Sequence, residues 1–511
     1  MTADIVVETT TGRVRGEIDR GVNLFKGIPY AAPPLGKQRF RPPQKVQPWS
    51  GVRDAVAYGN MAVQGDNVFG LPPDLLRIFT LGGVQKRDED CLYLNVWSSG
   101  LSGSGRPVLF WCHGGAFITG SGSSPWSDGA NLCRADDVVV VSFNHRLGAL
   151  GYLHLEDIAD DFAGAGTAGM MDIVAALEWV RDNIAAFGGD PGNVTIFGES
   201  GGGAKVSVLM ALPCAKGLFH KAIIQSGPAV QMANRDDGTS TARQVLEQLG
   251  LDAARAGELR QMPAARLLEA QGAVQANASR APFAERRRMG FNPVIDGKVF
   301  PGGPFAPAAP AVSADVPLMI GTNKDEHTLF SGHLPWVTGA TFENLAQGLK
   351  PQLGARAAEV VAAYRQAQPA MPADQVAIAI LSDAGVRAMS LQIAERKLAQ
   401  KAAPVFVYLF AWETPVLGGR LRSCHTLEIP FVFDNTTTAA LTGDDPARLA
   451  LAARMSRAWL AFARSGKPGH GDLPAWPVYS TADRATMIFD TTCRIENDPY
   501  GNERRVWETA P

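Results

Sequence analysis

The sequence is poor in cysteine, in net charge and in long apolar runs, and each shortage excludes a class of protein. Six cysteines are scattered over 511 residues without a Cys-x-x-Cys pair or a Cys/His cluster, which predicts neither a disulfide framework nor a zinc site. The formal net charge is −2 and no basic block occurs, so nucleic acid is not an expected partner. No run of roughly 18 apolar residues is present, and no membrane span is expected.

The start of the chain and its overall composition also lack special signals. Residues 1–16, MTADIVVETTTGRVRG, have no basic start followed by an apolar segment, so no secretory signal is expected. Together with the sparse cysteines, this favours a cytoplasmic protein. Hydrophobic residues make up 46% of the chain and charged residues 19%, which suits a large buried core. We expect no metal or other cofactor; the sequence leaves the oligomeric state open, with a monomer favoured.

The order of patterns along the chain predicts a mainly parallel sheet. After an alternating N-terminal stretch typical of hairpins, apolar runs at 106–112, 136–143, 193–198, 221–227, 316–323 and 404–410 are typical of strands buried on both faces. Segments with helical spacing separate them, so we expect helices on both faces of the sheet. Residues 235–290 and 340–400 lack strand patterns and are expected to be helical insertions over the carboxyl edge, within a single domain spanning 1–511.

The stretch FGESGG, residues 197–202, places a serine between glycines at a predicted strand-to-helix junction. A Gly-x-Ser-x-Gly match alone is weak evidence, because a glycine turn can carry a serine by chance. Here Gly198 and Gly202 would allow the sharp turn of a nucleophile elbow, in which Ser200 is exposed at the end of a strand. The following helix would also direct its amide-rich N-terminus toward Ser200.

A serine nucleophile needs a base and an acid, which in α/β-hydrolases follow it in the chain. The histidines after Ser200 are His220, His327, His333, His425 and His470. His425 is favoured because it follows a predicted strand, although spacing alone does not exclude His333. The acid is expected just after the strand at 316–323, where Asp325 and Glu326 are both candidates.

A tetrahedral intermediate needs amide donors for its negative oxygen. The segment FWCHGGAF provides small residues directly after a predicted strand, at Gly114, Gly115 and Ala116. A simple glycine turn would explain each feature alone. We call residues His113–Ala116 the amide loop. The candidate nucleophile, base and acid occur together with this loop and in the expected order, which favours a catalytic site.

Taken together, the motifs resemble those of the type-B carboxylesterases, the group that contains the bacterial para-nitrobenzyl esterases. The matching segments are FKGIPYAAPPLGKQRFRPP, EDCLYLNVW, NHRLGALGYL, FGGDPGNVTIFGESGG, GTNKDE and HTLEIPFVF, which extend over nearly the whole chain. The resemblance implies the α/β-hydrolase fold, with Ser200 as nucleophile, Glu326 as acid and His425 as base. It implies oxyanion donors at Gly115, Ala116 and Gly201, and supporting roles for Glu199 and Ser226.

The activity implied by the resemblance is hydrolysis of uncharged carboxylic esters through an acyl-enzyme, with a small-molecule ester as the partner. An amidase or a carbamate hydrolase would use the same residues, so these activities stay open. A non-catalytic binding module of the same fold is a further alternative, against which the intact set of residues argues.

The sequence departs from the family's pattern at three places. Residue 201 is glycine where alanine is usual, which we expect to loosen that amide donor. Cys91 matches one half of the family's loop disulfide, but Met61, Ala62 and Val63 stand where its partner would be, so Cys91 is expected to be a free thiol. No tryptophan occurs between residues 65 and 90, which argues against the choline recognition of cholinesterases.

Overall fold

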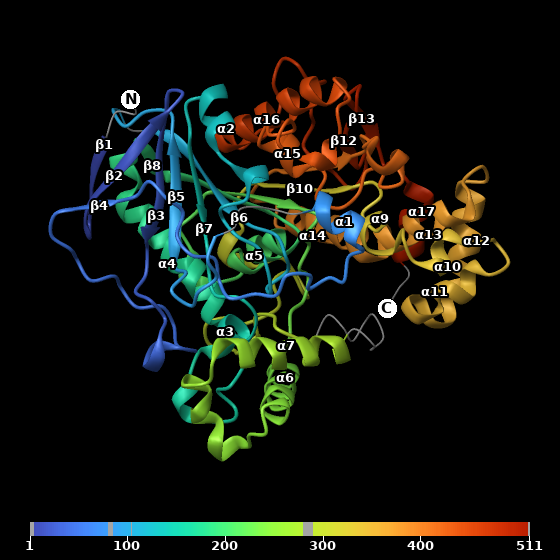
Figure 1. The fold of residues 1–511 in the computed structure, drawn as a ribbon. Helices are drawn as coiled ribbons and strands as arrows, with labels where there is room; N and C mark the ends of the chain where they lie inside the picture. Colours follow the sequence, from blue (N-terminus) through green and yellow to red (C-terminus); the bar gives the residue numbers. More distant parts are fainter. Residues whose placement is uncertain (1–4, 80–84, 104, 279–289, 509–511) are drawn as a thin grey trace.

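A single twisted sheet organises the molecule (Figure 1). The computed structural model describes residues 5–79, 85–103, 105–278 and 290–508. The strands are β1 (Ile5–Thr9), β2 (Gly12–Asp19), β3 (Val22–Pro29), β4 (Val52–Asp54), β5 (Tyr93–Ser98), β6 (Arg106–Cys112), β7 (Val139–Phe143), β8 (Gly189–Glu199), β9 (Lys221–Gln225), β10 (Leu318–Asn323), β11 (Val405–Phe410), β12 (Ala485–Phe489) and β13 (Arg494–Asn497).

The strand order is β1-β2-β3-β5-β7-β6-β8-β9-β10-β11-β12-β13, with β4 beside β2. All pairs from β7 to β12 are parallel, and the strands on either side of them pair antiparallel except β4, which is parallel to β2. The predicted parallel centre and N-terminal hairpins are therefore present. Because the carboxyl ends of parallel strands meet at one edge, the loops after β6, β8, β10 and β11 can converge there.

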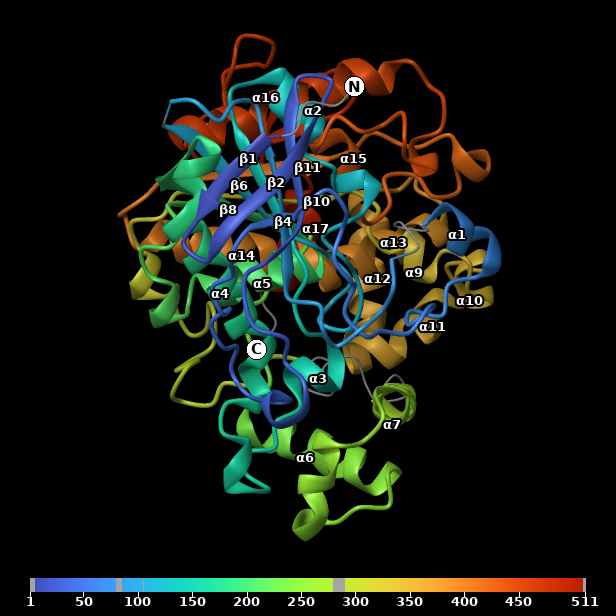
Figure 2. The ribbon, with the colours of Figure 1, turned by 60° about the vertical axis from the view of Figure 1, so that its left-hand side comes forward.

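Helices cover both faces of the sheet (Figures 1 and 2). They are α1 (Pro73–Ile78), α2 (Ala130–Ala135), α3 (Gly148–Tyr152), α4 (Ala168–Asn183), α5 (Gly201–Leu209), α6 (Arg235–Gln248), α7 (Ala264–Ala278), α9 (Thr328–Ser331), α10 (Pro335–Thr338), α11 (Leu345–Leu353), α12 (Ala357–Ala367), α13 (Ala373–Ser382), α14 (Ala388–Ala399), α15 (Ile429–Val432), α16 (Ala447–Ser465) and α17 (Gly501–Glu508). The segment before Cys91, whose glycines and prolines are typical of a surface loop, contains the short helix α1.

The alternation of side chains along β6 divides the core between the two faces. Val108 and Phe110 belong to the cluster that includes α4 and α5, whereas Leu109 and Trp111 belong to the cluster that includes α2 and α16. All four side chains are buried, as expected for a central strand covered on both sides. The sheet is thus held rigidly between two apolar layers, which fixes the strand ends that carry the loops.

The two segments predicted to be helical insertions contain helices. α6 and α7 lie between β9 and β10, at the bottom of Figure 1, and α9 to α14 lie between β10 and β11. Residues 279–289, the end of the first segment, lie outside the described residues. The helical stretch Ala373–Ala399 has a mean hydropathy of 1.4 over its most apolar window. By length and composition alone, this stretch could cross a membrane. Half of that window is buried inside the protein, which makes it weak evidence for a span.

Candidate active site

Ser200 lies in a strained turn between β8 and α5. Its φ of 54° and ψ of −121° fall in a region that residues with a side chain rarely adopt. The turn is held by a hydrogen bond from the Ser200 amide to the Gln225 carbonyl, 2.8 Å long. A Cβ built on Gly202 would lie 2.0 Å from the Cys112 carbonyl oxygen, and one on Gly198 would lie 2.6 Å from it. The glycines therefore permit the close approach of β6 that the turn requires.

His425 lies in the loop after β11 and contacts carboxylates on both of its ring nitrogens. Its Nδ1 donates a hydrogen bond to Glu326 Oε2 at 2.5 Å, and its Nε2 lies 3.2 Å from Glu199 Oε1. The other oxygen of Glu326 accepts the Asn323 amide at 2.8 Å, which fixes the carboxylate against the end of β10. The structure thus brings His425 between Glu326 and Glu199, the residue directly before Ser200.

The sequence left open one other acid, Asp325, and one other histidine, His333. Asp325 has different partners, and the Nδ1 of His333 makes no hydrogen bond within the described residues. The Asp325 carboxylate lies 3.2 Å from Arg422 and 3.5 Å from Lys324, and it accepts the Ser423 amide at 3.3 Å. Among the other histidines, the His220 ring accepts the Val194 amide at 3.1 Å, and the His470 ring bonds the Arg454 carbonyl at 3.0 Å. The geometry therefore separates Glu326 from Asp325, which the residue pattern alone could not do.

The loop after β6 turns its carbonyl groups into the protein. Gly115 and Ala116 have φ values of 88° and 51°. The carbonyls of His113 and Ala116 accept from the Lys205 ammonium, that of Gly114 bonds the His113 ring, and that of Gly115 accepts from the amide of Thr119. Within the part of the chain that the structure describes, the amides of Gly115 and Ala116 have no acceptor. This orientation leaves both N–H groups available to an oxygen at the site.

Comparisons of the sequence and of the structure with known proteins identify the family of the chain. The model of the carboxylesterase family matches residues 3–507. The chain belongs to the carboxylesterase family. It is 36% identical over 509 residues to the para-nitrobenzyl esterase of Bacillus subtilis (strain 168), covering 98% of each chain. It is 34% identical to the phenmedipham hydrolase of Pseudarthrobacter oxydans, covering 94% of each. A crystal structure of a Geobacillus stearothermophilus carboxylesterase superposes with a TM-score of 0.85, at 39% identity over 98% of this chain and 99% of the other.

The fold is therefore the α/β-hydrolase fold of the carboxylesterases, and the chain is a carboxylic ester hydrolase. The family resemblance also implies two structural ion pairs, Arg39 with Glu89 and Arg146 with Asp172, and both are present. The Arg39 guanidinium bonds Glu89 at 2.7 Å, and that of Arg146 bonds Asp172 at 2.6 Å. Both pairs tie loops near the site to the body of this carboxylesterase.

Three buried glutamates, which we call the acidic cluster, surround His425: Glu199, Glu326 and Glu428. Glu428, which the motifs do not single out, accepts hydrogen bonds from Asn323 at 2.7 Å and Gln225 at 3.2 Å. Its signal was a carboxylate inside the apolar run LEIPFVF, three residues after His425. Burial of a carboxylate costs free energy unless hydrogen bonds or opposite charges compensate for the lost solvation, so such a residue is a candidate for a functional role.

The acidic cluster shifts the proton affinities of the site. Burial raises the pKa of Glu199 well above its ordinary value. Burial, aided by the charge of Glu326, raises the pKa of Glu428 to about 7. Burial alone would lower the pKa of His425, but the charges of Glu199 and Glu326 raise it to about 9. The imidazole and the Glu199 carboxylate therefore compete for one proton.

A second group, which we call the basic cluster, lies beneath the amide loop: Lys205, His113 and His145. The two histidine rings stack with centroids 5.0 Å apart, and all three side chains are buried. Burial lowers the pKa of Lys205 to about 7 and, together with the Lys205 charge, that of His113 to about 3. The histidines are therefore neutral, and any charge in this cluster is on Lys205.

The surroundings of Gly201 do not match the expectation that a glycine at this position loosens the amide donor. A Cβ built on it would lie 2.3 Å from the amide nitrogen, Cα and carbonyl oxygen of Ala116. The loop at Ala116 thus approaches α5 more closely than an alanine at 201 would permit. The glycine fits the loop tightly against the N-terminus of α5, which argues against a loosened amide donor.

Ser226 is buried at the end of β9, but its hydroxyl makes no hydrogen bond within the described residues. Its amide donates to the Gly321 carbonyl at 2.9 Å, and its φ is 47°. The structure gives no direct hydrogen bond from Ser226 to the base. Its supporting role stays a prediction.

The loop around Cys91 is closed by hydrogen bonds, and all six cysteines are free. The Met61 amide donates to the Lys86 carbonyl, and the Asp88 amide donates to the Met61 carbonyl, each at 2.9 Å. The Gln64 side chain also bonds Thr119 at 2.6 Å and the Gly120 amide at 2.8 Å. These bonds tie the loop to the segment that follows the amide loop.

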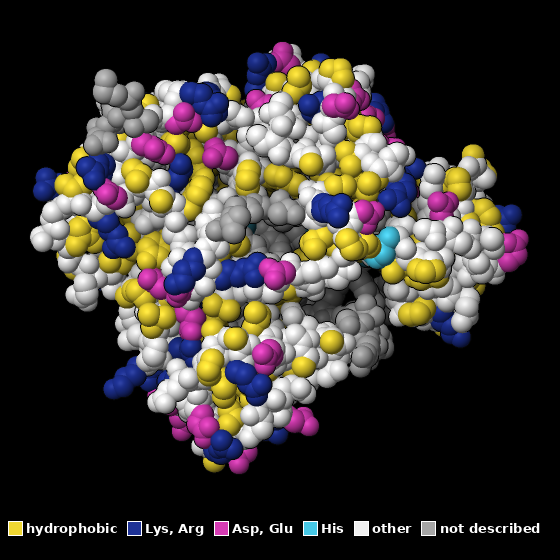
Figure 3. Space-filling view, viewed as in Figure 1, with side chains coloured by type: hydrophobic (Ala, Val, Ile, Leu, Met, Phe, Trp, Pro, Cys, Tyr) yellow, Lys and Arg dark blue, Asp and Glu magenta, His cyan; other side chains and the backbone are white. Residues whose placement is uncertain are grey.

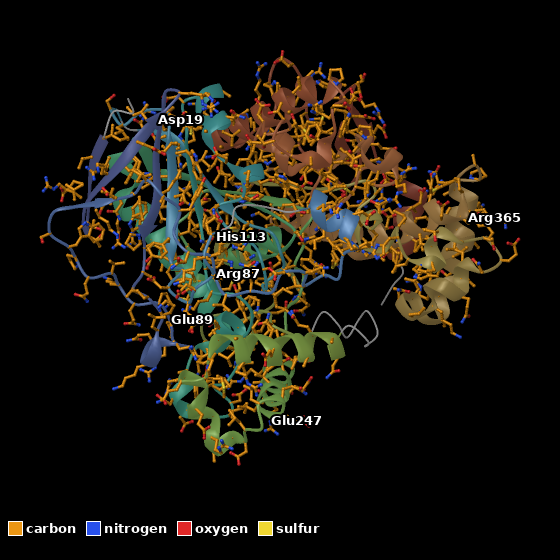
Figure 4. The ribbon with its side chains drawn as sticks, in the orientation of Figure 1. Asp19, Arg87, Glu89, His113, Glu247 and Arg365 are labelled. Carbon is orange, nitrogen blue, oxygen red and sulfur yellow. The ribbon has the colours of Figure 1, made fainter. Side chains whose placement is uncertain are left out.

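Figure 4 labels His113 at the centre of the molecule, near α5, and Arg87 in the loop beside it in this view. The space-filling view of the same face is hollowed near its middle, between α1 and α7 (Figure 3). His113, directly after β6, is buried, and both its label and the hollow lie near the centre of this face.

Proposed function

We propose that the protein hydrolyses uncharged carboxylic esters with Ser200 as nucleophile, His425 as general base and Glu326 as the residue that orients the imidazole. The observation that carries this proposal is the hydrogen bond from His425 Nδ1–H to Glu326 at 2.5 Å, which leaves Nε2 free to accept a proton. Nε2 lies 3.2 Å from Glu199, the residue directly before Ser200. The strained turn at Ser200 supports its role, since such strain concentrates at functional residues.

The reaction follows from these positions. Ser200 Oγ attacks the ester carbonyl while His425 Nε2 accepts the hydroxyl proton. The amides of Gly115, Ala116 and Gly201 stabilise the oxygen that becomes negative. The tetrahedral intermediate then expels the alcohol, which takes the proton from His425. Water, activated by the same imidazole, cleaves the acyl-enzyme and releases the carboxylic acid.

A chain-length panel of p-nitrophenyl esters tests this function, with a p-nitroanilide and a carbamate of matched size alongside. We expect rapid hydrolysis of the esters and much slower turnover of the anilide and carbamate. Faster cleavage of the anilide or carbamate would make the amidase or carbamate hydrolase the main activity. No turnover of any member would favour a binding module.

Ser200→Ala is the decisive variant within that panel. Loss of the nucleophile lowers kcat by about 10⁶-fold in hydrolases of this mechanism, and removing one hydroxyl costs little packing. We therefore expect no measurable activity and an unchanged melting temperature. Ser207→Ala, on the same helix, is the control and should retain activity. More than a few per cent of activity in Ser200→Ala would contradict the assignment.

A further inference from the structure

Lys205 is a buried lysine that the reaction described above does not use. It lies on α5, five residues after Ser200, in the otherwise apolar and small sequence GGGAKVSVL, and it has no exposed surface. A lysine is rarely fully buried unless its ammonium is paired, because removing the charge from water is costly. The groups that the Lys205 ammonium contacts therefore indicate the function of its charge.

The Lys205 ammonium donates to two carbonyls of the amide loop. Its Nζ lies 3.0 Å from the His113 oxygen and 2.7 Å from the Ala116 oxygen, and 5.3 Å from the centre of the Phe117 ring. The two carbonyls flank the peptide groups of Gly115 and Ala116 on both sides. One side chain thus fixes both ends of the segment whose amides face the site.

The backbone of this segment needs such support. Ala116 has a positive φ of 51°, which is unfavourable for a residue with a side chain. If the carbonyl of Ala116 lost its buried donor, it would gain by rotating toward water, and that rotation would swing the neighbouring amides away from the site. An ammonium donates stronger hydrogen bonds than a neutral group, so it holds the strained conformation more firmly.

We propose that Lys205 is the positioning residue of the oxyanion hole: it clamps the carbonyls of His113 and Ala116 so that the amides of Gly115 and Ala116 face the reacting oxygen. This proposal rests on the proposed serine mechanism. It assigns Lys205 no contact with substrate. The clamp acts mainly on the transition state, because the oxygen becomes fully negative only there.

The test is Lys205→Met, which retains most of the side-chain volume but has no donor. Another buried lysine offers a matched control: Lys397 on α14 donates to the Ser313 and Ala314 carbonyls, each at 2.7 Å, before β10. Both Lys→Met variants lose hydrogen bonds from a buried ammonium to two carbonyls. A general loss of stability should therefore lower both melting temperatures, whereas only the variant at Lys205 should lower kcat per active site.

Active sites are counted by titration with an organophosphate that releases p-nitrophenol, and kcat and KM are measured on p-nitrophenyl butyrate. We expect Lys205→Met to lower kcat by about 10²-fold, the effect of losing an oxyanion donor, with KM changed less than threefold. Lys397→Met should keep kcat within twofold. A trifluoromethyl ketone, which forms a tetrahedral adduct with the serine, should also bind Lys205→Met about 10²-fold more weakly.

A kcat within threefold of the parent, or a rise in KM alone, would overturn the clamp. If Lys205→Met yields no folded protein, Lys205→Gln is measured in the same way, since its amide retains donors but no charge. An intermediate loss of kcat supports the clamp, and an unchanged kcat overturns it. Failure of the serine mechanism would instead appear as activity in Ser200→Ala, which is independent of either result.

Discussion

The acidic cluster and the basic cluster both border the turn at Ser200, which Glu199 directly precedes and Lys205 follows by five residues, and they use burial in opposite ways. Glu199, Glu326 and Glu428 converge on one imidazole, and His425 titrates higher as a result. In the basic cluster burial keeps His113 and His145 neutral, and the ammonium of Lys205 bonds backbone rather than another side chain. The comparison suggests that the acidic side controls a proton, whereas the basic side controls the shape of a loop.

The difference follows from the kind of group that each side has to hold. A base must gain and lose a proton in each turnover, so its carboxylate neighbours have to adjust its affinity without removing it. An amide donor never changes protonation, and its usefulness depends only on where its N–H points. Electrostatics should therefore dominate the effects of mutations on the acidic side, and packing should dominate those on the basic side.

The packing half of the comparison is tested most strongly by Gly201→Ala. The new methyl would meet the backbone of Ala116 at 2.3 Å, so the amide loop has to move. A displacement of about 1 Å at a reacting group can cost up to about 10²-fold in rate, so we expect kcat to fall between about tenfold and 10²-fold. The pH dependence should not change, because no charge is altered. The measurement is kcat per titrated site across pH 5 to 10.

Gly272→Ala is a suitable control, because a Cβ at that helical position meets nothing within 4 Å. It should leave kcat unchanged. If Gly201→Ala kept the parent's kcat, the amide loop would move easily without loss of function. Packing would then not dominate the effects of mutations on the basic side.

The electrostatic half is tested by Glu199→Gln. His425 must be neutral at Nε2 to accept a proton, so kcat/KM falls as the pH drops below the pKa of the imidazole. The Glu199 carboxylate, 3.2 Å away, raises that pKa. Removing its charge should therefore move the acidic limb of the kcat/KM profile to lower pH, toward the ordinary value of about 6.5 for histidine. The profile is recorded on a neutral p-nitrophenyl ester.

Asp325→Asn serves as the matched control for this shift. Its carboxylate is next to Glu326 in the sequence but faces Arg422 and Lys324. The acidic limb should stay within a few tenths of a pH unit of the parent's. A limb that moved equally in both variants would mean that the net charge of the region, rather than the contact with Glu199, sets the pKa of His425.

The sequence could predict some parts of this site but not others, and the two clusters show why. Ser200 and the amide loop lie directly after apolar strands, so their positions follow from local pattern. The pairing of His425 with Glu326 rather than Asp325 depends on how the chain turns after β10, where two adjacent carboxylates have different partners. That choice is tertiary, and only the family resemblance indicated it.

Lys205 and Glu428 were missed for a common reason. Each is a charged residue within an apolar segment, a pattern that also fits a side chain reaching solvent from the end of a helix. Their partners come from other parts of the chain: the carbonyls on Lys205 lie about 90 residues away, and Asn323 is 105 residues from Glu428. Local spacing does not contain these contacts.

The smallest expected effect concerns the loop that borders the basic side, where the family's disulfide is missing. Cys91 is buried, and burial raises the pKa of its thiol, so it is a poor nucleophile toward oxidants. The loop is instead closed through Met61 and through Gln64, whose side chain bonds Thr119 and Gly120. Dithiothreitol should therefore change neither kcat nor the melting temperature, and thiol titration of the unfolded protein should count six free cysteines.

Gln64→Ala should lower the melting temperature and kcat modestly, because it releases the segment after the amide loop. If reductant lowered activity while Gln64→Ala did not, a covalent bond rather than these hydrogen bonds would hold this side of the site.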